Sequence, residues 1–330
     1  MAWSTAGEYP QATPCGFRGD GRRCTLVAVT RSQRRPERLA LQVFRGTDAR
    51  GEGVLTPKQL RGNSWVHLRR DVYADAKLED DHRLRCRAAM LVLPTGTTLC
   101  GLSAALVHGV DHAADRGTEV HVYPPIGKRI GPHTGVRVHT GRLAPTDLMR
   151  VGDELWTSPV RTAWDLGRWL PARESVPVID GLLAIDAVSE ADLAAYSRST
   201  FGQRGSRLAA RAFSVADGRS QSRPESVLRV RLVSAGLPKP VVQLAIVLPN
   251  GITLHPDLAW EEYRVAAEYD GLWHGDADQF HRDRRRLNLL VASGWLVLHV
   301  TSQRMRTDFA GVAREIRAAL ESRGWQPRSR

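Results

Sequence analysis

Residues 255–274 read HPDLAWEEYRVAAEYDGLWH, and this stretch holds five acidic residues and two histidines within two short apolar runs. The second run is typical of a strand that ends before Gly271. Because side chains alternate along a strand, we expect Glu268 and Asp270 to share one face. If the first run, residues 252–259, pairs with it as a hairpin, Asp257 approaches that same face.

These three carboxylates predict a metal site. Carboxylates held close together repel one another, and a divalent cation is the common remedy. Each also has a structural interpretation: Asp257 follows Pro256 and can simply start a turn, and Glu268 and Asp270 can line a solvated strand edge. The chain after Gly271 turns into a crossover helix, which implies a central strand, where exposed carboxylates are unusual. We therefore favour a metal-dependent hydrolytic site.

The surrounding pattern predicts an α-β-β-β-α-β core. A helix is expected over residues 224–234, and Gly294 is well placed to end a second helix. The unit from Arg264 to Thr301 is a strand–helix–strand crossover, which should be right-handed with its two strands parallel. The other expected elements are strands over 241–247, 253–260, 264–270 and 295–301 and helices over 278–293 and 308–323.

Six motifs in this region occur in the order and at the spacing of the PD-(D/E)XK nuclease superfamily. They are SRPE, GLPKPVVQ, HPDLAW, AEYDGLWH, DRRRLNLL and GWLVLHVT. Residues 222–303 most resemble the branch related to very-short-patch-repair (Vsr-like) endonucleases. The resemblance implies a restriction-endonuclease-like fold that hydrolyses phosphodiester bonds with Mg²⁺, for which Mn²⁺ can substitute.

The resemblance also implies roles for individual residues. Asp257 matches the aspartate of the motif and Glu268 its (D/E) position, so these two are expected to bind the metal ion. Glu225 matches the acid on the first helix, Asp270 stands where the lysine would be, and His274 matches a histidine of this branch. Without the lysine, we expect His274 to act as general base or as a donor to the leaving group.

Basic residues on the following helix are expected to contact phosphate. Arg284 and Arg286 can clamp a phosphate group, although three successive arginines on a helix are more often a solvated face. Glu225 has a similar structural alternative, as a first-turn acid that stabilises its own helix.

The distribution of charge indicates a polyanionic partner. The chain has 330 residues and a net charge of +12. Residues 1–70 hold 13 basic and 5 acidic side chains, residues 71–220 hold 18 of each, and residues 221–330 hold 16 and 12. A general preference for arginine would raise the charge everywhere, so the neutral middle favours phosphate contacts at the two ends.

Composition excludes a membrane-spanning chain and indicates several domains. Hydrophobic content of 42% and charged content of 25% are those of a soluble globular protein. No run of eighteen apolar residues and no signal core is present, so we expect a cytoplasmic protein of two or three domains. The four cysteines form no CxxC pair, which is typical of reduced thiols.

The N-terminal quarter predicts a small DNA-binding domain. Residues 1–40 lack periodicity and are expected to be a disordered tail, or an over-long start of the reading frame. Residues 40–44 are helix-like, Thr56 followed by Pro57 marks a helix start, and residues 65–70 read as a short basic helix running into a strand. This order is typical of a winged helix-turn-helix over residues 41–80. Its expected nucleic-acid contacts are Lys58, Arg69 and Arg70.

The motifs VLTPKQL and VYAD, with LCGLSAALVHGV and TSPVRTAWDLGRWL further on, resemble AbiEi-like antitoxins. Residues 81–215 are therefore expected to form an AbiEi-like middle domain of helices and strands without a catalytic cluster. Residues 216–330 complete the chain as the nuclease domain. The expected fold class is mixed α/β, with a winged-helix-like N-terminal domain and a restriction-endonuclease-like core at the C-terminus.

The sequence predicts a Mg²⁺-dependent DNA endonuclease of defence or repair type. The alternative is an antitoxin-like DNA-binding transcriptional regulator whose nuclease fold is inactive. RNA is a third option, because phosphodiester chemistry at this site does not identify the sugar. A homodimer or a toxin-type protein partner is compatible with both interpretations, and the sequence does not choose between them.

Overall fold

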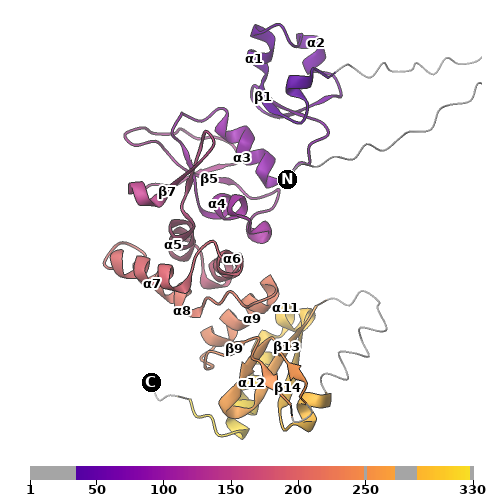
Figure 1. The fold of residues 1–330 in the computed structure, drawn as a ribbon, viewed down its shortest axis with the longest axis vertical. Coiled ribbons are helices and arrows are strands. Elements are labelled where there is room, and N and C mark those ends of the chain that lie inside the picture. Colours follow the sequence, from indigo (N-terminus) through magenta and orange to yellow (C-terminus); the bar gives the residue numbers. More distant parts are fainter. Residues whose placement is uncertain (1–34, 249–250, 272–287, 328–330) are drawn as a thin grey trace, which may run out of the picture. The chain divides into compact units, whose positions relative to one another are not determined.

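A computed structural model describes residues 35–248, 251–271 and 288–327 (Figure 1). Of the described residues, 44% are helical and 18% lie in strands, which form several sheets, so the expected mixed α/β class is confirmed. None of the described helices is long and apolar enough to cross a membrane.

The first part of the chain folds as three antiparallel strands with two short helices. The sheet order is β1-β3-β2, and both helices lie between β1 and β2 in the chain. The Thr56 hydroxyl accepts a hydrogen bond from the Gln59 backbone N–H at 3.3 Å, as expected for a helix start. The elements are a 3₁₀ helix Glu37–Leu39, β1 (Val43–Arg45), α1 (Gly46–Gly51), α2 (Pro57–Leu60), β2 (Trp65–Arg69) and β3 (Val72–Asp75).

Three predictions for this part are wrong. Residues 40–44 do not form a helix, because Leu41 has a positive φ of 54° and its N–H donates to the Asp75 carboxylate. The basic helix expected over residues 65–70 is strand β2, whose Trp65 packs edge-on against Phe44 in the local core. The predicted tail also ends before residue 40, because Leu39 is buried in that core.

The middle part is a five-stranded sheet followed by a layer of helices. The sheet order is β6-β5-β4-β8-β7. The Ser158 hydroxyl accepts from the Arg161 N–H at the start of α5, and Gly109 ends α4 with a φ of 116°. The strands are β4 (Thr98–Leu99), β5 (Val120–Tyr123), β6 (Val136–Val138), β7 (Leu148–Val151) and β8 (Glu154–Thr157); the helices are α3 (His82–Met90), α4 (Gly101–His108), α5 (Pro159–Trp169), α6 (Ala172–Ala184), α7 (Glu190–Ser199) and α8 (Ser206–Val215).

A buried polar network joins this sheet to its helices. The Tyr123 hydroxyl accepts from the guanidinium groups of Arg161 and Arg168 at 2.8 and 2.7 Å and donates to Asp165 at 3.0 Å. Arg161 also donates to Asp147 at 2.7 Å. Because each charge has an opposite partner, the network fixes α5 on the sheet without leaving an uncompensated buried ion.

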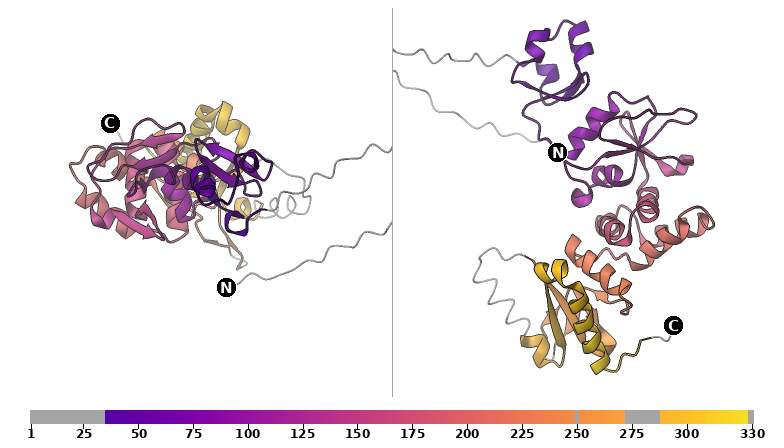
Figure 2. Two further views of the ribbon diagram at one scale, coloured as in Figure 1. Left: turned by 90° about the horizontal axis from the view of Figure 1, so that it is seen from above. Right: turned by 180° about the vertical axis from the view of Figure 1, so that it is seen from behind.

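The last part of the chain is a four-stranded mixed sheet between helices and a small hairpin (Figure 2). The order is β14-β13-β12-β9, and β13 and β14 are parallel, as predicted. Residues 288–292 are helical, and the remainder of the expected helix 278–293 lies mostly outside the described residues. The elements are α9 (Arg223–Ser234), β9 (Val241–Val242), β10 (Ile246–Val247), β11 (Thr253–Leu254), β12 (Leu258–Trp260), a 3₁₀ helix Glu261–Tyr263, β13 (Val265–Asp270), β14 (Leu296–Thr301), α11 (Ser302–Thr307) and α12 (Phe309–Ser322).

Two predicted strands are each broken in two. The strand expected over 241–247 is interrupted at Gln243, whose φ is 50°. The strand expected over 253–260 is interrupted before Leu258, in a segment where Pro256 has no N–H to donate. The outer halves, β10 and β11, therefore pair with each other as a separate hairpin. This hairpin covers one face of the main sheet.

Helix α9 joins the middle part to the C-terminal sheet. Its Leu228 and Leu232 pack into the core of that sheet, and its Val230 packs with α5 and α6. Between these two cores, the fully buried guanidinium of Arg229 pairs with the Asp180 carboxylate of α6. Helix α9 is therefore a structural element of both regions.

We expect Asp180→Asn to destabilise the protein strongly. It leaves the Arg229 guanidinium buried without its counter-charge, which costs about 3–5 kcal/mol in comparable sites. Urea unfolding followed by circular dichroism measures the loss. As a control, Glu315→Ala removes one of the two acidic partners of Arg304 in an exposed ion pair and should leave the midpoint almost unchanged. Equal midpoints for Asp180→Asn and the wild type would contradict the prediction.

Candidate functional site

Four polar residues form a row across the C-terminal sheet. In the register of β12 and β13, Leu258 faces Ala267, so the next pair outward is Asp257 and Glu268. Glu268 in turn faces His299 on β14. On the other side of β12, Leu258 faces Val242, which places Gln243 opposite Asp257. The row therefore runs Gln243, Asp257, Glu268, His299.

All four side chains of this row are expected on one face of the sheet. Residues directly opposite each other in neighbouring strands point the same way, with Cβ atoms about 5 Å apart. Ala259, Ala266 and Val297 each lie two positions along their strand from a member of the row, so they share its face. All three pack under the hairpin of β10 and β11. The opposite face carries Val265 and Ala267 in the core beneath α9 and α12. The predicted alternation along residues 264–270 is thus confirmed.

The Asp257 carboxylate is held by two hydrogen bonds. Its Oδ2 accepts from the Tyr269 backbone N–H at 2.8 Å, and its Oδ1 accepts from the Gln243 side-chain amide at 3.2 Å. These two bonds, one to each carboxylate oxygen, orient the group. Asp257 therefore does more than start a turn.

Gln243 adopts a backbone conformation that is unfavourable for a residue with a side chain. Its φ of 50° lies in the left-handed region, which costs a non-glycine residue on the order of 1 kcal/mol or more. The strain coincides with the break between β9 and β10 and with the hydrogen bond to Asp257. The Gln221 amide donates to the Gln243 side chain at 3.3 Å, so the group that orients Asp257 is itself oriented.

Glu225 lies near this row and also caps its own helix. Its carboxylate accepts from the Gln221 N–H at 2.8 Å and from the Ser222 hydroxyl at 2.7 Å. Burial raises the pKa of the Glu225 carboxyl, and the neighbouring Asp257 carboxylate adds to that rise. The capping role expected as the alternative is therefore present, together with proximity to Asp257.

His299, like Gln243, is a residue of this site that the sequence analysis missed. Its Nδ1 lies 2.9 Å from the Asp270 carboxylate, which is two residues beyond Glu268 on the same face. The hydrogen bond to Asp270 raises the pKa of His299, and the charges of Asp270 and Glu268 act in the same direction. The parallel register of the two predicted strands was the signal that could have found it.

The donor set of the row is compatible with Mg²⁺. No group of three or more His, Cys, Asp or Glu side chains that could hold a metal ion occurs among the residues that the structure describes. Mg²⁺ in nucleases and polymerases is usually bound by one or two carboxylates, with waters and substrate phosphates completing its shell. Asp257 and Glu268, directly opposite each other, match that requirement.

The other predicted site residues are either outside the described residues or in the N-terminal part of the fold. His274, Arg284 and Arg286 fall outside the described residues. Arg69 is the last residue of β2, Arg70 is in the turn to β3, and Lys58 is on α2, so all three belong to the N-terminal sheet and helices. They are not part of the row. Burial lowers the pKa of Arg69, and Arg85 on α3 adds to this.

Comparison with known proteins finds relatives but no function. The chain is 28% identical over 264 residues to an uncharacterized protein of Mycobacterium tuberculosis strain CDC 1551 and equally to one of strain H37Rv. The match covers 80% of this chain and 95% of each relative. No family model and no solved structure matches the chain.

We expect Asp270→Asn to lower the pKa of the His299 imidazole toward its ordinary value. The carboxylate favours the protonated ring, and an amide lacks that charge. NMR titration of the ring signals, assigned with His299→Gln, measures the change. Glu321→Gln, which neutralises an exposed carboxylate of α12, is the matched control and should not move the pKa. An unchanged His299 pKa in Asp270→Asn would show that the Asp270 contact is not formed in solution.

Proposed function

We propose that the chain is a Mg²⁺-dependent nuclease that acts on DNA, with its site at the row of Gln243, Asp257, Glu268 and His299. The register that aligns these residues across four strands is the observation that carries the proposal. The predicted element order resembles that of the PD-(D/E)XK superfamily, and the resemblance of the motifs supports the same assignment.

Each residue of the row would have a separate role in phosphodiester hydrolysis. Asp257 and Glu268 would hold the metal ion, which when bound makes a water more acidic and offsets charge on the phosphate. Gln243 and the Tyr269 N–H keep Asp257 in a single orientation. Asp270 orients the imidazole of His299, so that its other ring nitrogen can hold or pass a proton next to the carboxylates.

The N-terminal region supports DNA as the substrate. Its exposed basic side chains include Lys58 of α2, Arg61 directly after that helix, and Arg70 in the turn between β2 and β3. Such groups bind the phosphate backbone of a duplex and release counterions. This use agrees with the resemblance of the region to AbiEi-like DNA-binding antitoxins.

We expect Asp257→Asn to abolish nicking of supercoiled plasmid by the purified protein in Mg²⁺ or Mn²⁺. The initial rate should fall roughly 100-fold or more, as for other losses at metal sites. Calorimetric titration with Mn²⁺ should lose its binding signal as well. As a control, Glu262→Gln removes the same charge from the 3₁₀ helix that connects β12 to β13, at the end of these strands away from the row. This variant should retain wild-type rates.

Two outcomes would redirect the proposal. Equal nicking by the wild type and Asp257→Asn would mean that the row is not the site. Binding of DNA without nicking, unaffected by Asp257→Asn but weakened when Arg69 and Arg70 are replaced by Gln, would favour the antitoxin-like regulator with an inactive nuclease fold. Gel-shift titrations over a range of salt concentrations distinguish the two cases.

A further inference from the structure

Helices α7 and α8 and the loop between them present a basic surface with two exposed apolar side chains. Phe201 in the loop is 87% exposed, and Leu208 on α8 is 59% exposed. Leu208 and the exposed Arg207 and Arg211 follow the spacing of one helical face. We call this set the α7–α8 surface; its members are Arg198, Phe201, Arg204, Arg207, Leu208 and Arg211.

The arginines of this surface have no acidic residues close to them in the sequence. No Asp or Glu occurs between Asp192 and Asp217. In the part of the chain that the structure describes, none of the four forms an ion pair. Other exposed arginines of the same region do so: Arg83, Arg116 and Arg137 lie 3.1, 2.7 and 2.8 Å from carboxylates. The α7–α8 surface therefore keeps its full positive charge.

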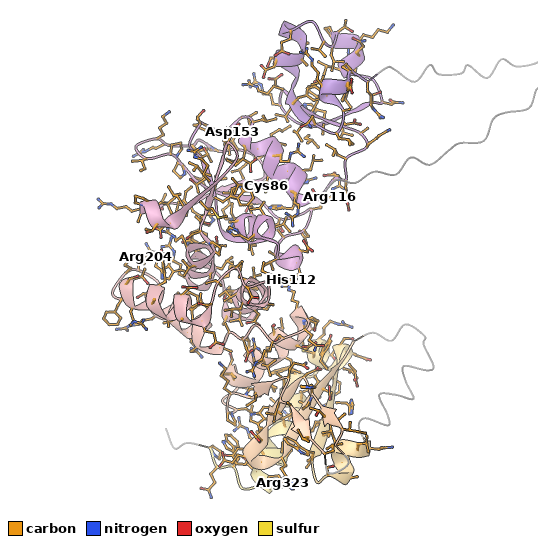
Figure 3. All side chains as sticks on the ribbon, viewed as in Figure 1. Cys86, His112, Arg116, Asp153, Arg204 and Arg323 are labelled. Atoms are coloured by element: carbon orange, nitrogen blue, oxygen red, sulfur yellow. The ribbon has the colours of Figure 1, made fainter. Side chains whose placement is uncertain are left out.

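Helix α8 is closely packed on the side opposite its exposed arginines. The side of α8 opposite the arginines buries Ala209 and Ala212. A Cβ atom at Gly167 of α5 would lie 3.0 Å from the Ala209 Cα, so the two helices approach closely there. Helix α8 is held in place by this contact. Figure 3 shows the Arg204 side chain at the outer edge of these helices.

We propose that the α7–α8 surface binds single-stranded nucleic acid, with Phe201 stacking on an unpaired base and the arginines binding the flanking phosphates. Successive turns of α8 space Arg207 and Arg211 about 6 Å apart along the helix axis, so they can engage different phosphates. An aromatic side chain surrounded by cations is the usual arrangement for strands whose bases are not paired. A duplex offers no free base face to Phe201.

The chemistry favours a nucleic acid over an acidic protein or an anionic membrane. All four cations are arginines, whose planar guanidinium groups match phosphate oxygens in pairs. The surface uses no residue of the row on the C-terminal sheet. The inference therefore goes beyond the proposed nuclease function and does not depend on it.

The test measures binding of a fluorescent oligothymidylate to the full chain by anisotropy, in EDTA so that no divalent cation supports cutting. We expect the variant with Arg204→Gln, Arg207→Gln and Arg211→Gln to bind about tenfold more weakly or worse. Loss of three phosphate contacts should also reduce the slope of log Kd against log salt by about 2. Phe201→Ala should weaken binding about fivefold or more.

The control removes the same charge from arginines that already have acidic partners. Arg83→Gln, Arg116→Gln and Arg137→Gln together should change Kd by less than about twofold, because each of these charges is balanced by a carboxylate. Ile126→Ala, at an apolar side chain that is 92% exposed in another loop, controls for Phe201→Ala. Circular dichroism of every variant establishes that the fold is retained.

Two results would overturn the proposal. Wild-type Kd and salt slope in the folded triple-arginine variant would show that the α7–α8 surface does not contact nucleic acid. Loss of binding in that variant with no effect of Phe201→Ala, and with equal affinity for a duplex, would show phosphate binding without base stacking. In that case the surface would not select single strands.

Discussion

The buried ion pair between Arg229 and Asp180 is the constraint on which the C-terminal site depends. It lies between two hydrophobic cores. One contains residues of α5 and α6, the other contains residues of the C-terminal sheet, and helix α9 contributes side chains to both. A buried charge is tolerated only with its partner in place, so the pair fixes how α9 lies on α6. One turn earlier, the same helix carries Glu225 beside Asp257. The position of that acid is therefore set by the middle region as well as by the sheet.

Strand register is the second constraint on the site. A shift of one residue between any two strands would move a member of the row to the opposite face. The apolar residues that precede the row resist such a shift, because Ala266 and Ala267 are completely buried on opposite faces. The breaks at Gln243 and before Leu258 release the outer strand halves into their own hairpin. Strands β9 and β12 therefore end beside the row, whereas β13 and β14 continue two residues beyond it.

Local patterns in the sequence predicted local features well. Alternation placed Glu268 and Asp270 on the face opposite Ala267, and Thr56, where the sequence indicated a helix start, caps α2 in the structure. Local patterns gave the wrong element where strand pairing between distant segments determines the structure. Residues 65–69 carry a helix-like set of side chains, yet they pair with β3 because Trp65 can then pack on Phe44. His299 was missed because its significance comes from a neighbouring strand.

The sequence by itself determined the mixed α/β class, the order of elements in the last part of the chain and the gathering of carboxylates on residues 257–270. Those features depend on periodicity, caps and motif order, which are properties of short segments. Only the tertiary structure decided which residues stand opposite one another: Asp257 with Gln243, Glu268 with His299, and Arg229 with Asp180. Such pairs are separated by many residues along the chain, and burial and strand register, which depend on the whole fold, bring them together.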